Sequence, residues 1–144
     1  MKLGISTWSL PWAIGVPGYS RPPRSLDAVG LLERALEANA AVVQIADNLP
    51  SIVAHHAETL HTMPQRERDR LCNAARENPL TLEVGTRGLD SEHLRHYLTI
   101  AGQLDARFLR TVLSGSLCGA EEMSRAEHNI RQVLPAYYPK TRFV

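Results

Sequence analysis

Short apolar runs alternate with longer segments of helical period along this chain. Four runs are too short for helices and mostly end in Gly, Ser or Asn: Leu3 to Trp8, Val42 to Asp47, Thr81 to Gly85 and Phe108 to Leu113. Four alternations of strand and helix predict parallel strands joined by right-handed crossovers, because parallel neighbours need a long connection that a helix supplies. The predicted class is α/β, built from parallel (β/α) units.

The helical segments carry recognisable end signals. They are predicted to run from Ser25 to about Asn39, from the capping box at Thr62 to Asn78, from the N-cap Asp90 through Leu104, and from about Met123 to a stop at Pro135. The third is the clearest, because its apolar positions recur on one face. Long loops follow the first two strands, at the strand ends where α/β proteins place their sites.

One polar residue per strand is predicted on the sheet face turned away from the helices: Ser6, Gln44, Glu83 and Arg110. Burying a carboxylate and a guanidinium is costly unless they pair, and Glu83 and Arg110 lie on successive strands. One interpretation is the floor of a substrate pocket, where Arg110 and Gln44 bind substrate and Glu83 orients a hydroxyl or moves a proton. The other is a structural ion pair filling a barrel centre.

Further candidates follow the strand ends. Trp8 and Trp12 could stack on a sugar ring, or Trp12 could simply pin its loop. Asp47, Asn48 and Arg87 could bind hydroxyls or phosphate, although Asp47 and Asn48 are also typical turn residues. We favour a binding role for Asp47 and Arg87 and leave the tryptophans open.

Composition narrows the classes of function. The 144 residues include sixteen basic and fifteen acidic side chains, so no strong field toward nucleic acid or membrane is expected, and a small-molecule ligand fits better. Cys72 and Cys118 form no CxxC motif and are expected to be reduced thiols, which indicates the cytoplasm. We expect no signal peptide and no membrane span.

The histidines give little support for a metal site. His55 and His56 are adjacent and cannot easily face one ion, and His93 and His96 lack a completing set of ligands, so surface positions are favoured. HExxH, P-loop, zinc-finger and GxGxxG patterns are absent from the sequence. A flavodoxin-like domain is disfavoured, because the prolines after the first strand remove phosphate-binding backbone donors.

Several ordered segments carry a family resemblance: LGISTWSLPWAIGVPGY, VVQIADNLP, LTLEVGTRGLD and HLRHYLTIAGQLDARFLRTVL. From about Met1 to Leu134 the chain resembles the N-terminal half of bacterial sugar-phosphate isomerases/epimerases with the xylose isomerase-like TIM barrel. The resemblance implies a divalent metal, manganese, magnesium or similar, bound by Glu, Asp, His and Glu on later strands. It implies metal-assisted proton transfer through an ene-diolate on a sugar or sugar phosphate. AP endonucleases share this barrel, but a basic DNA footprint is lacking.

The resemblance divides the expected domain at Pro135. Residues 1–144 are expected to form one partial barrel with strands 1 to 4, and residues 135–144 a divergent tail without a fifth strand. A complete barrel needs about 250 residues, so our hypothesis is a premature stop, a frameshift or a split gene. We expect this chain to lack the metal ligands and to be inactive alone. Exposed sheet edges favour a homodimer or a complementary half-barrel. The alternative is a non-catalytic half-barrel that binds or assembles.

Overall fold

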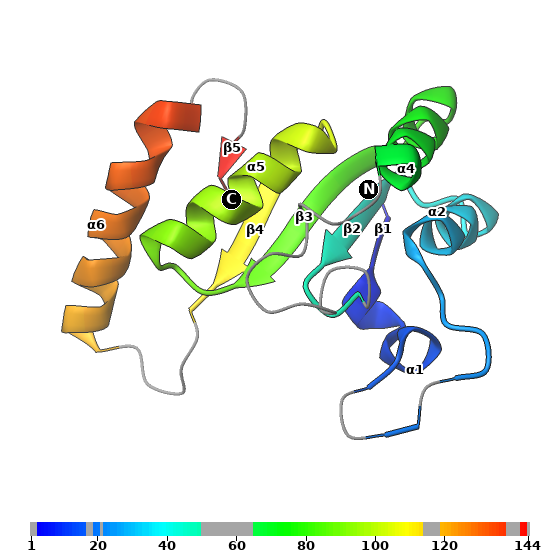
Figure 1. The fold of residues 1–144 in the computed structure, drawn as a ribbon, viewed down its shortest axis with the longest axis horizontal. Coiled ribbons are helices and arrows are strands. Elements are labelled where there is room, and N and C mark those ends of the chain that lie inside the picture. The colour runs from blue at the N-terminus through cyan, green and yellow to red at the C-terminus, as the bar shows by residue number, and fades with distance from the viewer. Residues whose placement is uncertain are drawn as a thin grey trace.

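The computed structural model describes residues 3–16, 19–20, 22–49, 65–113, 119–137 and 142–143. The elements follow one another as β1 (Gly4–Ser6), η1 (Thr7–Ser9), α1 (Pro11–Ile14), α2 (Ala28–Glu37), β2 (Val42–Ala46), α4 (Gln65–Glu77), β3 (Thr81–Arg87), α5 (Ser91–Gln103), β4 (Phe108–Val112), α6 (Ala120–Tyr137) and β5 (Arg142–Phe143). All strands are parallel, in the consecutive order β1-β2-β3-β4-β5. The fold is α/β, with parallel βα units arranged as in half of a (β/α)8 barrel (Figure 1).

The four predicted strands are confirmed, with shifted ends. β1 ends at Ser6 rather than at Trp8, because the Ser6 side chain accepts a hydrogen bond from the Trp8 backbone N–H and caps the short helix η1. β3 continues to Arg87, two residues beyond the prediction. The added length brings Thr86 and Arg87 to the carboxyl ends of the strands, beside the end of β2 at Ala46.

Two helices begin at an aspartate cap and end alike. The cap of α5, Asp90, is the predicted one, whereas α2 begins at Ala28 behind Asp27 and not at the predicted Ser25. The Asp27 carboxylate accepts the Gly30 N–H at the start of α2, and the Asp90 carboxylate accepts the His93 N–H at the start of α5. Both helices are followed by a residue in the left-handed region, Asn39 at φ 53° and Asp105 at φ 52°. Short polar side chains such as these tolerate the left-handed conformation better than most. At both positions this conformation turns the chain sharply toward the next strand.

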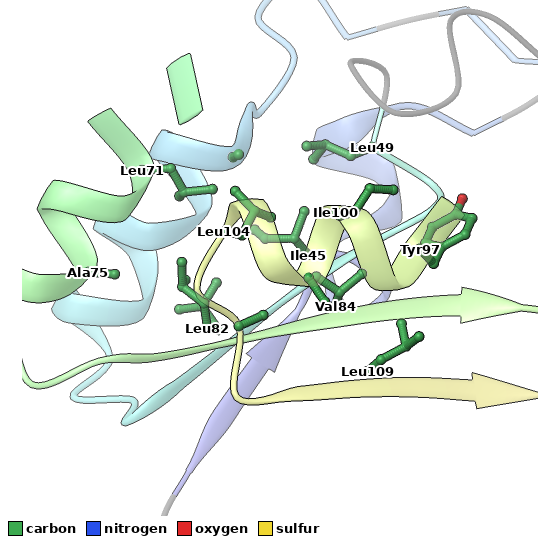
Figure 2. Close-up of a cluster of buried hydrophobic side chains, with 14 of the residues drawn as sticks. Ile45, Leu49, Leu71, Ala75, Leu82, Val84, Tyr97, Ile100, Leu104 and Leu109 are labelled. Carbon is green, nitrogen blue, oxygen red and sulfur yellow. The ribbon is translucent and has the colours of Figure 1, made fainter. Parts of the chain in front are cut away.

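The core lies on one face of the sheet. The outward residues Val43, Ile45, Leu82, Val84 and Leu109 are buried, as the alternation predicts. Helix α2 packs on β2, and α5 packs on β3 and β4. Figure 2 shows Leu71 and Ala75 meeting this cluster from α4, Tyr97 and Ile100 meeting it from α5, and Leu104 meeting it from the cap that follows α5. The helices therefore leave the opposite face of the sheet for polar side chains.

Three expectations from the sequence are wrong in detail. The fourth helix passes through Pro135 and ends at Tyr137, because a proline near a helix end removes only one hydrogen bond. A fifth strand does follow, since Arg142–Phe143 pair in parallel with Phe108 and Leu109. The long first loop, expected from Ser9 to Arg24, contains the short helix α1. The predicted start of the second helix, residues 62–64, lies outside the described residues, as do His55, His56 and Cys118.

Within the described ranges, no helix combines the length and the apolar character needed to cross a membrane.

Candidate functional site

Three polar residues lie side by side, in register, on the sheet face turned away from the helices, which we call the inner face. Ser6 pairs with Gln44, and Gln44 pairs with Glu83. The Ser6 hydroxyl donates to Gln44 Oε1 at 2.8 Å. The Gln44 side chain also lies over Gly85, where an added Cβ would stand 3.0 Å from Gln44 Cδ. Glycine at 85 therefore leaves the space that the Gln44 amide occupies.

Glu83 and Arg110 form the ion pair that the sequence indicated. Arg110 is in register with Gly85, so it stands one inward-facing position nearer the carboxyl ends and reaches back diagonally to Glu83. Its Nε donates to Glu83 Oε2 at 2.7 Å. The Glu83 side chain is 7% exposed and the Arg110 side chain is 50% exposed. The hydrogen bond and charge of Glu83 raise the pKa of Arg110. The guanidinium is held by Glu83 at Nε, while half of the Arg110 side chain stays exposed.

A pocket of about 300 Å³ lies above this pair, at the carboxyl ends of the strands. Its walls are Trp8, Gln44, Ala46, Asp47, Gly85, Thr86, Arg87, Arg110 and Val112. Five of the predicted binding residues are thus brought together, namely Trp8, Gln44, Asp47, Arg87 and Arg110. Their binding roles stay predictions. Glu83 is not part of the pocket wall, but it accepts a hydrogen bond from Arg110, which is.

Asp47 is placed by the backbone of the neighbouring strand. Its Oδ2 accepts the Arg87 backbone N–H at 3.0 Å and faces the Thr86 hydroxyl at 3.4 Å. The Thr86 hydroxyl also contacts His93 Nε2 at 2.8 Å. Sequence reasoning missed Thr86 and His93 as parts of the site. The one available signal was the position of Thr86 directly before Arg87, since His93 gave no sign of facing a strand end.

Trp12 and Asn48 do not line the pocket. Trp12 is exposed on α1, and its ring meets the edge of Tyr19 with centroids 5.2 Å apart, which agrees with the loop-pinning interpretation. The Asn48 side-chain amide donates to the Thr7 carbonyl at 3.2 Å, and the Thr7 hydroxyl accepts the Ala46 N–H at 3.1 Å. Asn48 therefore ties the end of β2 to η1.

A second hollow, of about 430 Å³, lies at the amino-terminal end of β3, away from the polar face. Cys72, Arg76 and Asp105 contribute to its wall. Burial raises the pKa of the Cys72 thiol, so the thiolate needed for reactivity is disfavoured there. The hollow at the carboxyl ends is the better candidate site despite its smaller volume, because it gathers charged and amide groups from three strands.

The described residues do not fit the metal that the family resemblance implies. Among them, no group of three or more His, Cys, Asp or Glu side chains is placed to hold an ion. The two carboxylates nearest the pocket already have partners, since Glu83 binds Arg110 and Asp47 binds the Arg87 N–H. Four converging ligands are therefore not available in this part of the chain.

Comparison with known proteins finds similarity to an enzyme. No protein-family model matches the chain. It is 33% identical over 137 residues to the 3-oxo-isoapionate decarboxylase of Pectobacterium atrosepticum, and the alignment covers 95% of this chain. This is similarity to a decarboxylase. The same alignment covers 45% of the decarboxylase, so the chain spans about half the length of this relative.

Proposed function

We propose that this chain supplies one wall of the active site of a barrel enzyme that acts on a small sugar-derived anion, a sugar acid or a sugar phosphate. The observation that carries the proposal is Arg110, a half-exposed guanidinium fixed by Glu83 and facing the pocket. A guanidinium fork binds carboxylate or phosphate with directional hydrogen bonds. Gln44 and Asp47 line the same pocket and are of the types that bind hydroxyls.

The name of the similar protein supports an anionic substrate. The substrate in that name, 3-oxo-isoapionate, is a carboxylate with a ketone group. Loss of carbon dioxide from a 3-oxo acid leaves an enolate, and removal of a proton beside a carbonyl leaves the same kind of oxyanion. The isomerase/epimerase reaction expected from the family resemblance and a decarboxylation therefore need similar stabilisation of negative charge.

Arg110 is proposed to bind the anionic group or the developing oxyanion, and Glu83 to act by holding Arg110 in place. Trp8 offers an apolar surface for the carbon skeleton at the pocket edge. Because the described residues do not fit a metal ion, no step of the proposal runs through one. The rest of the active site, including any metal ligands, is proposed to come from further barrel strands.

A non-catalytic role is the second candidate, favoured by the exposed apolar side chains of Trp8 and Val112 beside the pocket. In that case the inner face of the sheet would bind a second copy or a complementary half-barrel without chemistry. The mass of the chain in solution, recorded with and without an anionic probe, separates the two roles. Assembly that occludes the pocket and abolishes probe binding would favour the second.

The test of the proposed function is calorimetric binding of D-erythronate and ribose 5-phosphate to the 144-residue chain. Erythritol serves as the uncharged comparison. We expect the anions to bind and Arg110→Met to weaken binding by about tenfold or more, because one charge-assisted contact is lost. The matched control is Arg131→Met, which removes an exposed arginine on α6. Equal binding by wild type and Arg110→Met would contradict the proposal.

A further inference from the structure

A line of hydrogen-bonding groups leads from α5 to the wall of the pocket. His93 Nε2 lies 2.8 Å from Thr86 Oγ1, and Thr86 Oγ1 lies 3.4 Å from Asp47 Oδ2. The same Oδ2 accepts the Arg87 backbone N–H at 3.0 Å. Asp47 and Thr86 line the pocket, whereas His93 stands behind them and is half-buried.

The imidazole ring of His93 is held in one orientation. Gly88 passes beside it with φ 124°, and a Cβ at that position would stand 3.4 Å from His93 Nε2 and Cδ2. The Tyr97 ring packs on it at a centroid distance of 4.6 Å. The His93 backbone N–H is fixed by the Asp90 cap at 2.9 Å. These contacts keep Nε2 directed at Thr86, so the contact between them is built into the fold.

Simple counting of protons sets the direction of these hydrogen bonds. An ionised carboxylate only accepts, and a threonine hydroxyl has a single proton to donate. When the Thr86 proton points to Asp47 Oδ2, Thr86 Oγ1 must act as acceptor toward His93. His93 Nε2 then carries a proton.

We propose that His93 is a positioning residue for Asp47: its Nε2–H donates to Thr86, and Thr86 donates to Asp47 Oδ2. In the described part of the chain the bonds of this carboxylate are made by Oδ2, so Oδ1 accepts from a substrate hydroxyl. This role in substrate binding rests on the proposed function, whereas the order of the hydrogen bonds does not.

The groups around the ring agree with a neutral imidazole. Burial lowers the pKa of His93, against the opposing effects of the Asp90 and Asp47 charges. Burial raises the pKa of the Tyr97 phenol, while a hydrogen bond with Thr86 lowers it. A neutral ring with its proton on Nε2 therefore agrees with the lowered pKa of His93 and with Thr86 as the acceptor of that proton.

The test is long-range ¹H–¹⁵N correlation NMR of the histidine rings in the ligand-free chain near pH 7.5, with His93→Gln used to assign the signal. We expect His93 to be neutral and protonated on Nε2. Asp47→Ala frees the Thr86 proton to donate to His93, so the population protonated on Nδ1 should rise. Thr86→Val should give a mixture of tautomers, and Thr86→Ser should restore the wild-type pattern.

A wild-type ring protonated on Nδ1 would overturn the proposal, as would an unchanged tautomer in both Asp47→Ala and Thr86→Val. For the substrate-binding part, His93→Gln should weaken D-erythronate binding by about two- to tenfold, the effect of one displaced hydrogen bond. His128→Gln on α6 is the control and should bind as wild type. If wild type binds no erythronate, the proposed function fails. The His93 tautomer measured by NMR still tests the direction of the hydrogen bonds.

Discussion

Burial distinguishes two ion pairs that have the same length. Arg110 and Glu83 approach to 2.7 Å, and so do Arg131 and Glu127. The carboxylate of the first pair is 7% exposed, whereas both partners of the second are more than half exposed. An exposed pair gains little because water screens it, but removing the partner of a buried carboxylate leaves a costly uncompensated charge.

Arg110→Met should therefore lower the free energy of unfolding by about 1.5–3 kcal/mol, the range for a hydrogen bond to a charged group. Arg131→Met should change it by less than about 0.5 kcal/mol, as is usual for an exposed pair within one helix. Urea unfolding followed by circular dichroism measures both. Equal losses in the two variants would mean that Glu83 gains no stabilisation from Arg110 beyond that of a surface pair.

Single residues show which contacts the sequence can predict. The period of two in a strand placed Ser6, Gln44 and Glu83 on one face, and the pair of Glu83 with Arg110 followed from their successive strands. The contact of His93 with Thr86 could not be predicted in this way. It depends on the turn at Gly88 and on how α5 returns over β3, which no local pattern encodes.

Glycine has opposite effects on stability at two positions, one in a strand and one in a helix. In β3, a Cβ at Gly85 would lie 3.0 Å from Gln44 Cδ and 3.2 Å from Ala46 Cβ. In α5, a Cβ at Gly102 would meet nothing within 4 Å. Strand β3 needs glycine at this position because the Gln44 side chain of β2 lies over it, whereas glycine lowers the stability of helix α5.

We expect Gly85→Ala to destabilise the chain by about 1–3 kcal/mol, the usual range for overpacking, and to displace the Gln44 amide from Ser6. Gly102→Ala should stabilise it by about 0.5–1 kcal/mol through helix propensity. Thermal melting of both variants against wild type is the measurement. A neutral Gly85→Ala would show that Gln44 moves aside without cost.

Element types could be predicted better than element ends. The strands followed from their apolar runs, and helices α2 and α5 followed from their periodicity. Asp90 is the predicted cap of α5, whereas α2 begins behind Asp27, three residues after the predicted start at Ser25. The end of α6 cannot be predicted from Pro135, because the apolar stripe that includes the buried Val133 keeps the last turns on the core. A short helix such as α1 carries too few periods to be recognised.

At the scale of the whole molecule, the lowered pKa of His93 links stability to pH. Burial moves this pKa below the ordinary 6.5, so the unfolded chain takes up the proton at a higher pH than the folded chain does. The stabilisation associated with neutral His93 is complete above about pH 6.5. It is lost as the pH falls toward the folded-state pKa and does not decrease further below it.

The free energy of unfolding should therefore fall between pH 7.5 and pH 5, and His93→Gln should make this fall smaller. Urea titrations at both pH values give the difference, and His128→Gln, an exposed histidine, should keep the wild-type difference. A His93→Gln variant with an undiminished fall would assign the pH dependence to other groups.

The consecutive strand order has a kinetic consequence. Each strand pairs with the strand that precedes it along the chain, so every pairing closes a loop of only one βα unit. Such an order lets the sheet grow stepwise, one unit docking on the previous one, and no early strand must wait for a distant partner. A chain built this way can begin to fold while its later units are still being synthesised.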